Sequence, residues 1–186
     1  MRIIAGNLKG KKIFLPKDKN TRPLRDMVKE SIFNLIEHSN KFYCSIINSN
    51  VLDLFSGSGS FGLECISRGA EKVTFVENYN NALLILKKNI NYFSVNKNSK
   101  IIMESCFKIF GSNNKFENKF DIIFIDPPYK EAKVNEIIEN IKKEKILNNN
   151  GIIILHRHKK DTVVISNKLK ILDERIYGVS KITYGN

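Results

Sequence analysis

The 186-residue chain has few cysteines and no long apolar run, and both absences narrow the class of protein. Cys44, Cys65 and Cys106 are odd in number and form no CxxC pair, so the sequence suggests neither a disulfide framework nor a zinc site. No apolar segment approaches the roughly 20 residues needed to cross a bilayer, and residues 1–6 lack the apolar stretch of a signal peptide. We therefore expect a cytoplasmic protein with no membrane partner.

Acidic residues are also scarce, because 19 Asp and Glu stand against 31 Lys and Arg and leave a formal net charge of +12. The excess lies at the chain ends: residues 1–30 hold nine basic against three acidic residues, and residues 156–186 hold seven against three. A codon bias toward Lys and Asn would explain the total better than it explains this distribution. Since a localised basic surface attracts polyphosphates, we expect a nucleic-acid partner.

The order of the predicted elements indicates an α/β fold. Residues 1–20 form a predicted basic hairpin, and residues 26–38 have apolar side chains at helical spacing. Apolar strands then alternate with helices, and they are expected near 51–55, 73–76, 101–103, 121–125 and 152–155, with two last strands near 170–176 and 180–184. Repeated β-α-β units make a parallel sheet, whose ligands bind beyond the carboxyl ends of the strands. Residues just past 55, 76, 103 and 125 should therefore share one rim.

A glycine-rich turn follows the first strand and contains a GxGxxG pattern at Gly57, Gly59 and Gly62. That pattern alone also fits a dinucleotide-binding protein, or a tight turn without a ligand. Asp53, however, places a carboxylate near the position of a pyrophosphate, and a carboxylate suits a ligand with a cationic amine, such as S-adenosylmethionine (SAM). Glu77 ends the second strand, where its carboxylate could accept hydrogen bonds from both ribose hydroxyls of either cofactor.

The tetrapeptide Asp126-Pro127-Pro128-Tyr129 follows the apolar strand at 121–125 and is the most specific signal in the chain. Two prolines fix the backbone and remove two N–H donors, so the loop is rigid and rich in acceptors. The Asp126 carboxylate and the carbonyls of Asp126 and Pro127 could accept both protons of a planar amine. Tyr129 could stack on the base that carries this amine. The loop therefore predicts chemistry at an exocyclic amine.

With these residues the chain resembles the class I SAM-dependent methyltransferases that act on exocyclic amines, which carry a D/N-P-P-Y/F tetrapeptide. Its N-terminal segments also resemble the bacterial 16S rRNA guanine-N2 methyltransferase family (RsmD), as do later segments, and the matching residues are 2–6, 21–23, 26–34, 52–59, 67–70, 124–129 and 177–178. The resemblance implies a Rossmann-like α/β fold with a mostly parallel seven-stranded sheet of order 3-2-1-4-5-7-6, the last strand antiparallel. Residues 41–186 would be the methyltransferase domain, and residues 1–40 an RNA-contacting hairpin and helix packed on it.

The resemblance also implies roles for individual residues. SAM, which leaves as S-adenosylhomocysteine, would be bound by Asp53, Phe55, Ser56, Gly57, Ser58 and Gly59, by Glu77 and Asn78 at the ribose, and by Ser105 and Cys106 at the adenine. The guanine N2 amine would be bound by Asp126 and Pro127 within a loop completed by Pro128 and Tyr129. Ribosomal RNA, within a small-subunit particle, would be bound by Arg2, Lys9, Lys11, Lys12, Arg22, Arg25 and Lys29. No metal is required, and we expect a monomer.

Four positions depart from the family pattern, and Arg25 and Met27 are two of them. Leu24 stands where Thr is usual, and His156 stands where an acid is frequent. We expect His156 and His158 to belong to a basic rim rather than to a metal pair, because no set of Cys or carboxylate partners is evident for them. The open alternatives are methylation of adenine N6, cytosine N4 or a protein glutamine, a nicotinamide-dependent oxidoreductase, and a non-catalytic RNA-binding module.

Overall fold

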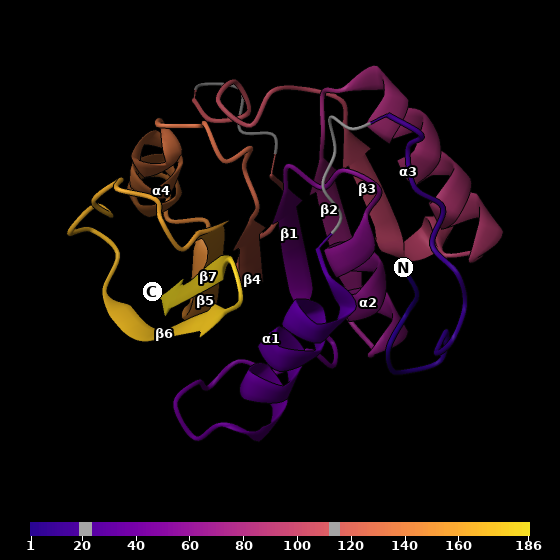
Figure 1. Ribbon diagram of the computed structural model, residues 1–186, viewed down its shortest axis with the longest axis horizontal. Helices are drawn as coiled ribbons and strands as arrows, with labels where there is room; N and C mark the ends of the chain where they lie inside the picture. Colours follow the sequence, from indigo (N-terminus) through magenta and orange to yellow (C-terminus); the bar gives the residue numbers. More distant parts are fainter. Residues whose placement is uncertain (19–23, 112–115) are drawn as a thin grey trace.

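A single seven-stranded sheet forms the centre of the protein in the computed structural model, which describes residues 1–18, 24–111 and 116–186 (Figure 1). The strands are β1 (Asn50–Leu54), β2 (Lys72–Val76), β3 (Ser99–Ile102), β4 (Phe120–Ile125), β5 (Leu147–His158), β6 (Ile171–Tyr177) and β7 (Ser180–Gly185). Their order is β3-β2-β1-β4-β5-β7-β6. Strands β1 to β5 pair in parallel, and β7 is antiparallel to β5 and β6. The predicted sheet order and the antiparallel last strand are confirmed.

Helices cover both faces of this sheet: α1 (Asp26–His38), α2 (Ser60–Ser67), α3 (Asn80–Tyr92) and α4 (Val134–Lys143), with a short 3-10 helix η1 (Asn96–Asn98). Because successive strand residues point to opposite faces, Val51 and Leu52 enter two different cores. The core that contains Val51 also contains buried residues of α1, α2 and α3, whereas the other core contains those of α4. Figure 1 shows α4 well separated from these three helices.

Two elements differ from the sequence prediction. The N-terminal hairpin has a single bridge between Arg2 and Lys12 instead of two regular strands. Strand β5 begins at Leu147, well before the apolar run at 152, because Leu147 already pairs with Phe120 of β4. Phe120 pairs with Leu147 but Ile122 pairs with Ile152, so the register of the two strands shifts between these pairs, as at a β-bulge.

The N-terminal segment shares the main core, since Ile3 and Ile13 are buried with α1, α2 and α3. Glu64 of α2 is the polar anchor of this segment. Its carboxylate accepts hydrogen bonds from the backbone of Ile4 (2.8 Å) and Ala5 (2.9 Å), and it is paired with Lys29 (3.1 Å) and Arg68 (3.0 Å). A buried carboxylate needs such partners, so residues 1–5, α1 and α2 are held together at one point.

No helix within residues 1–18, 24–111 and 116–186 is both long enough and apolar enough to cross a membrane.

Candidate active site

The carboxyl ends of five strands form one row, as their register requires. Leu54 pairs with both Val76 and Ile125, Val76 with Ile102, and Ile125 with Leu155. The residues that follow these strand ends are therefore neighbours, namely Phe55, Glu77, Met103, Asp126 and His156. Backbone hydrogen bonds continue across this rim, from Glu77 N–H to the Ile102 carbonyl (3.2 Å) and from Asp126 N–H to the Leu54 carbonyl (3.3 Å). The shared rim predicted for the first four strands is present.

The glycine loop leaves β1 through a run of unusual backbone angles. Phe55, Gly57 and Gly59 have positive φ values of 58°, 55° and 81°. A bulky residue such as Phe55 rarely adopts this conformation, and such strain concentrates at functional sites. At Gly59 a side chain is excluded for a second reason, because an added Cβ would lie 2.5 Å from the Leu86 side chain. At Gly57 nothing lies within 4 Å of an added Cβ, which leaves the backbone open to a ligand.

Asp53 lies beneath this loop and is more deeply buried than the sequence suggests, with 1% of its surface exposed. Its Oδ2 accepts a hydrogen bond of 3.0 Å from the N–H of Gly62, in the first turn of α2. Burial raises the pKa of Asp53 to about 8; the Gly62 hydrogen bond opposes the shift, and the charges of Asp126 and Glu77 add to it. A cationic ligand at this rim would stabilise the ionised carboxylate.

Glu77 closes β2 and organises the neighbouring loop. Its Oε2 accepts the N–H of Gly57 (2.8 Å), and its Oε1 accepts the N–H groups of Asn78 and Tyr79, both at 2.8 Å. An ionised carboxylate offers about four acceptor positions, so one position is left for a hydroxyl. The predicted bidentate contact to a ribose would therefore have to displace a backbone donor. Asn78 lies beside Glu77 and is exposed.

Ser56 and Ser58 lie within the loop and are buried, and the Ser56 N–H bonds the Val76 carbonyl at 3.1 Å. Ser105 and Cys106 follow β3, as the predicted adenine edge requires. Cys106 is buried, and burial raises the pKa of its thiol to about 12, so the side chain is an apolar surface and not a nucleophile. Ser105 is half-buried, and its hydroxyl caps the N–H of Phe107.

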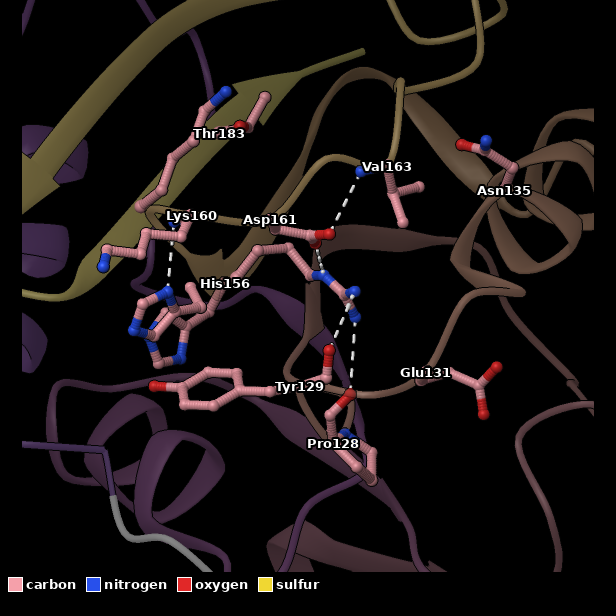
Figure 2. Close-up of polar contacts among 12 residues, drawn as sticks. Pro128, Tyr129, Glu131, Asn135, His156, Lys160, Asp161, Val163 and Thr183 are labelled. Carbon is pink, nitrogen blue, oxygen red and sulfur yellow. Dashed lines mark hydrogen bonds and ion pairs between the residues drawn. The ribbon is translucent and has the colours of Figure 1, made fainter.

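The loop Asp126–Tyr129 is held in place by Arg157, a residue that the sequence did not indicate as part of the site. The Arg157 guanidinium, on β5, donates to the carbonyls of Pro128 (3.4 Å) and Tyr129 (3.3 Å) and is paired through Nε with Asp161. Figure 2 shows the dashed contacts of Pro128, Tyr129 and Asp161 meeting at one guanidinium. Arg157 and Pro127 are buried, whereas Pro128 is exposed and Tyr129 half-exposed. A bidentate cation thus engages the second half of the loop.

The position of His156 contradicts the prediction that this residue belongs to a basic rim. The residue is 6% exposed, and its Nδ1 lies 2.8 Å from Oδ1 of Asp126 while its Nε2 lies 2.9 Å from Oγ of Ser180. Residue spacing alone could not show this, but the pairing of Ile125 with Leu155 puts the next two residues side by side. His158 is the neighbour of the Tyr129 ring, at 5.3 Å between ring centroids.

The predicted RNA-binding residues divide into three groups. Arg2, Lys9, Lys11, Lys12 and Arg25 are exposed. Arg22 lies outside the described residues. Lys29 is 0% exposed, donates to the Arg2 carbonyl (2.8 Å) and is paired with Glu64, so its ammonium faces the interior and not a phosphate. Helical spacing could not distinguish Lys29 from a surface lysine, because its partner Glu64 is distant in the sequence.

The hairpin lies away from the rim. The N–H of Asn7 bonds the Ser67 carbonyl (2.8 Å), at the end of α2 opposite the glycine loop. Eight helical residues span about 12 Å, so Lys9 is separated from the rim by roughly that length. The chain then returns along α3, where buried Asn89 bonds Phe14 and donates to the Ser58 carbonyl at 2.9 Å. One amide thus links the N-terminal segment to the glycine loop.

The rim gathers three carboxyl groups in a basic protein, because Asp53, Glu77 and Asp126 lie close enough to interact electrostatically. These carboxyl groups suit a ligand with an ammonium or sulfonium group, and the open face at Gly57 leaves room for its approach. SAM carries both cations, so the residues present fit this cofactor better than the pyrophosphate of a dinucleotide. Within the described part of the chain, no group of three or more His, Cys, Asp and Glu side chains is arranged to hold a metal ion.

Known proteins resemble the chain along nearly its whole length. The family model described as "Conserved hypothetical protein 95" matches residues 1–186. A Buchnera aphidicola protein named "Ribosomal RNA small subunit methyltransferase D" is 35% identical, over 94% of this chain and 86% of its own, and a Haemophilus influenzae protein of the same name is 30% identical over 96% and 90%. The solved structure "Putative methyltransferase yhhF" from Escherichia coli superposes with a TM-score of 0.82 at 24% identity, over 100% of this chain and 97% of its own.

Proposed function

The chain belongs to the family described as "Conserved hypothetical protein 95", and from this premise we propose that it transfers a methyl group from SAM to the exocyclic N2 amine of a guanine in 16S ribosomal RNA. The named relatives support a small-subunit rRNA methyltransferase. The observation that carries the choice of an amine is the placement of Asp126–Tyr129 beside the glycine loop, where the Asp126 N–H bonds the last carbonyl of β1.

The residues of the rim divide the work between cofactor and substrate. The loop 55–59 and Glu77 would hold SAM, and SAM supplies an activated methyl group, so no covalent enzyme intermediate is needed. Asp126 and the Pro127 carbonyl would accept the two amine protons and so aim the nitrogen lone pair at the methyl group. Asp126 also stabilises the positive charge that develops on nitrogen, and it can take the proton that the nitrogen loses.

The RNA is proposed to lie across the exposed cations of the N-terminal segment, from Arg25 to the hairpin near Lys9. Such a footprint extends beyond one nucleotide and suits a structured target, as in a small-subunit particle in the cytoplasm. Since the proposed site is built from one chain, a monomer is sufficient.

Methyl transfer to rRNA from cells that lack the gene tests this function. With labelled SAM and either naked rRNA or small-subunit particles, nucleoside mass spectrometry should find one new N2-methylguanosine. Methylated adenine or cytosine, or a protein as the only labelled species, would replace the guanine assignment. Retention of NADH in place of SAM would remove the methyltransferase assignment itself.

Two variants separate the proposed roles. Asp126→Ala should lower the rate by about 100-fold or more, the usual cost of removing one preorganised electrostatic contact, with little change in SAM affinity by calorimetry. Glu77→Ala should instead weaken SAM binding. A near wild-type rate for Asp126→Ala, or unchanged SAM affinity for Glu77→Ala, would remove that residue from the site.

A further inference from the structure

The Asp126 carboxylate is held by a protein partner on one of its two oxygens. Oδ1 lies 2.8 Å from Nδ1 of His156, and the other ring nitrogen lies 2.9 Å from the Ser180 hydroxyl. His156 and Ser180 are both buried, so water does not readily replace either contact. The three side chains come from the end of β4, from β5 and from β7, which are consecutive in the sheet. Oδ2 makes no hydrogen bond with another described residue.

The chemistry of these groups fixes the direction of the hydrogen bond to Asp126, and for a neutral imidazole it also fixes the direction of the bond to Ser180. An ionised carboxylate only accepts, so the nitrogen that faces Asp126 must carry a proton. A neutral imidazole has one donor and one acceptor, so Nε2 must then be the acceptor. Ser180 can donate its hydroxyl proton to Nε2. The chain of hydrogen bonds therefore runs from Ser180 through His156 to Asp126, and every member is satisfied while the ring is neutral.

A single hydrogen bond of this kind has a large effect on an aspartate. The last torsion of an aspartate side chain is broad and roughly two-fold, so an unsupported carboxylate turns freely between many orientations. A buried donor on Oδ1 removes this freedom. Since Arg157 holds the carbonyls of Pro128 and Tyr129, the backbone of the same loop is fixed as well.

We propose that His156 is the positioning residue of Asp126: as the Nδ1–H tautomer, oriented by Ser180, it holds Oδ1 and presents Oδ2 to the amine of the substrate. The proposal rests on the proposed function, which makes Asp126 the contact to that amine. His156 itself does not touch the substrate. It acts by keeping one acceptor at a fixed position, as orienting groups do in other preorganised sites.

Three replacements of His156 distinguish a donor from a space-filling residue. In His156→Asn the amide nitrogen can occupy the place of Nδ1 and donate to Asp126. In His156→Gln the amide reaches toward the place of Nε2, and in His156→Ala both contacts are lost. We expect kcat to fall about ten- to a hundredfold in the Gln and Ala variants, the range found when a group that orients a metal ligand is removed. His156→Asn should stay within about threefold of wild type, and SAM affinity and KM for RNA should change little in all three.

The tautomer gives a readout that does not depend on catalysis. Nitrogen NMR of the ligand-free wild-type protein at about pH 9, where an imidazole is ordinarily neutral, should find the proton of His156 on Nδ1. A proton on Nε2 would overturn the proposal whatever the activity. Ser180→Ala should keep the proton on Nδ1 and lower kcat less than His156→Ala.

The effect of each variant on the rate can be separated from its effect on folding. All variants are first compared by circular dichroism and urea unfolding, and rates are measured below the unfolding transition. If folded His156→Asn is as slow as His156→Ala, or if His156→Gln is as fast as wild type, His156 does not act through a donor to Asp126. If wild-type protein methylates no RNA, the proposed function fails, and the NMR result still decides whether His156 orients Asp126.

Discussion

Replacing Asp53 with Asn should stabilise the protein, and by an amount that grows with pH. The side chain is fully enclosed, and burial raises the pKa of Asp53 to about 8, against an ordinary value of 3.8. An asparagine has nearly the same shape, and its carbonyl oxygen can still accept the Gly62 N–H. The substitution therefore removes the ionisable group and leaves the packing in place.

The sign follows from counting protons. Between pH 3.8 and about 8, Asp53 is ionised in the unfolded chain and protonated in the folded chain, so the folded state binds one proton more. The free energy of unfolding of the wild type then falls by up to about 1.4 kcal/mol per pH unit as pH rises through this window, and it levels off above the folded pKa. Asp53→Asn lacks this contribution. Between pH 5 and pH 7 the advantage of the variant should grow by roughly 2 to 3 kcal/mol.

Urea unfolding of both proteins at pH 5 and pH 7 measures this difference, because titrating groups that do not interact with Asp53 contribute equally to both. A stability difference that does not change with pH would refute the raised pKa of Asp53. SAM binding supplies the functional counterpart: a cation at the rim favours the ionised carboxylate, so wild-type affinity should rise as pH approaches 8. Asp53→Asn should bind SAM more weakly, and its affinity should not rise with pH. Asp53 would then lower the stability of the fold while it contributes to SAM binding.

Three further predictions concern the supports of the site. Arg157→Met should lower the free energy of unfolding by about 3 kcal/mol in urea titrations, because it leaves the largely buried Asp161 without its cation. Arg157→Lys should have a lower kcat than the wild type, because an ammonium cannot reproduce the bidentate contact to the carbonyls of Pro128 and Tyr129. Lys29→Met should cost less stability than Arg157→Met, because Glu64 keeps its pair with Arg68 and its two backbone donors, and it should leave the salt dependence of RNA binding unchanged. Arg25→Ala should instead reduce the slope of log K against log salt by about 0.7 to 0.9. A reduced slope for folded Lys29→Met would return Lys29 to the RNA interface. Gly59→Ala should destabilise the fold by about 1 to 3 kcal/mol, since its φ is +81° and its Cβ would meet Leu86, and unchanged thermal stability would contradict the strain argued for the glycine loop.

The sequence predicts the frame of this protein well because the frame is encoded locally. Apolar strands, the turn at Gly57–Gly59 and the helical spacing of 26–38 are properties of short segments, and α1 matches its predicted bounds. The resemblance to a known family adds the strand order, which local patterns do not contain. The regular strands predicted for the N-terminal hairpin are not formed, because its backbone hydrogen bonds to Glu64 and Ser67 replace part of the expected strand pairing.

The residues that sequence reasoning misplaced are those whose partners are distant along the chain. Lys29 and His156 carry side chains that are usually exposed and are interpreted as surface charge unless a partner is known. Glu64 and Asp126 are those partners, and only the folded sheet brings each pair together. Burial then gives each basic residue a different role. Lys29 connects α1 to the N-terminal segment, and His156 contacts the proposed amine-binding carboxylate. A net charge of +12 thus overstates the cations available to RNA, while the rim at the other end of α2 is governed by three carboxyl groups and the groups that orient them.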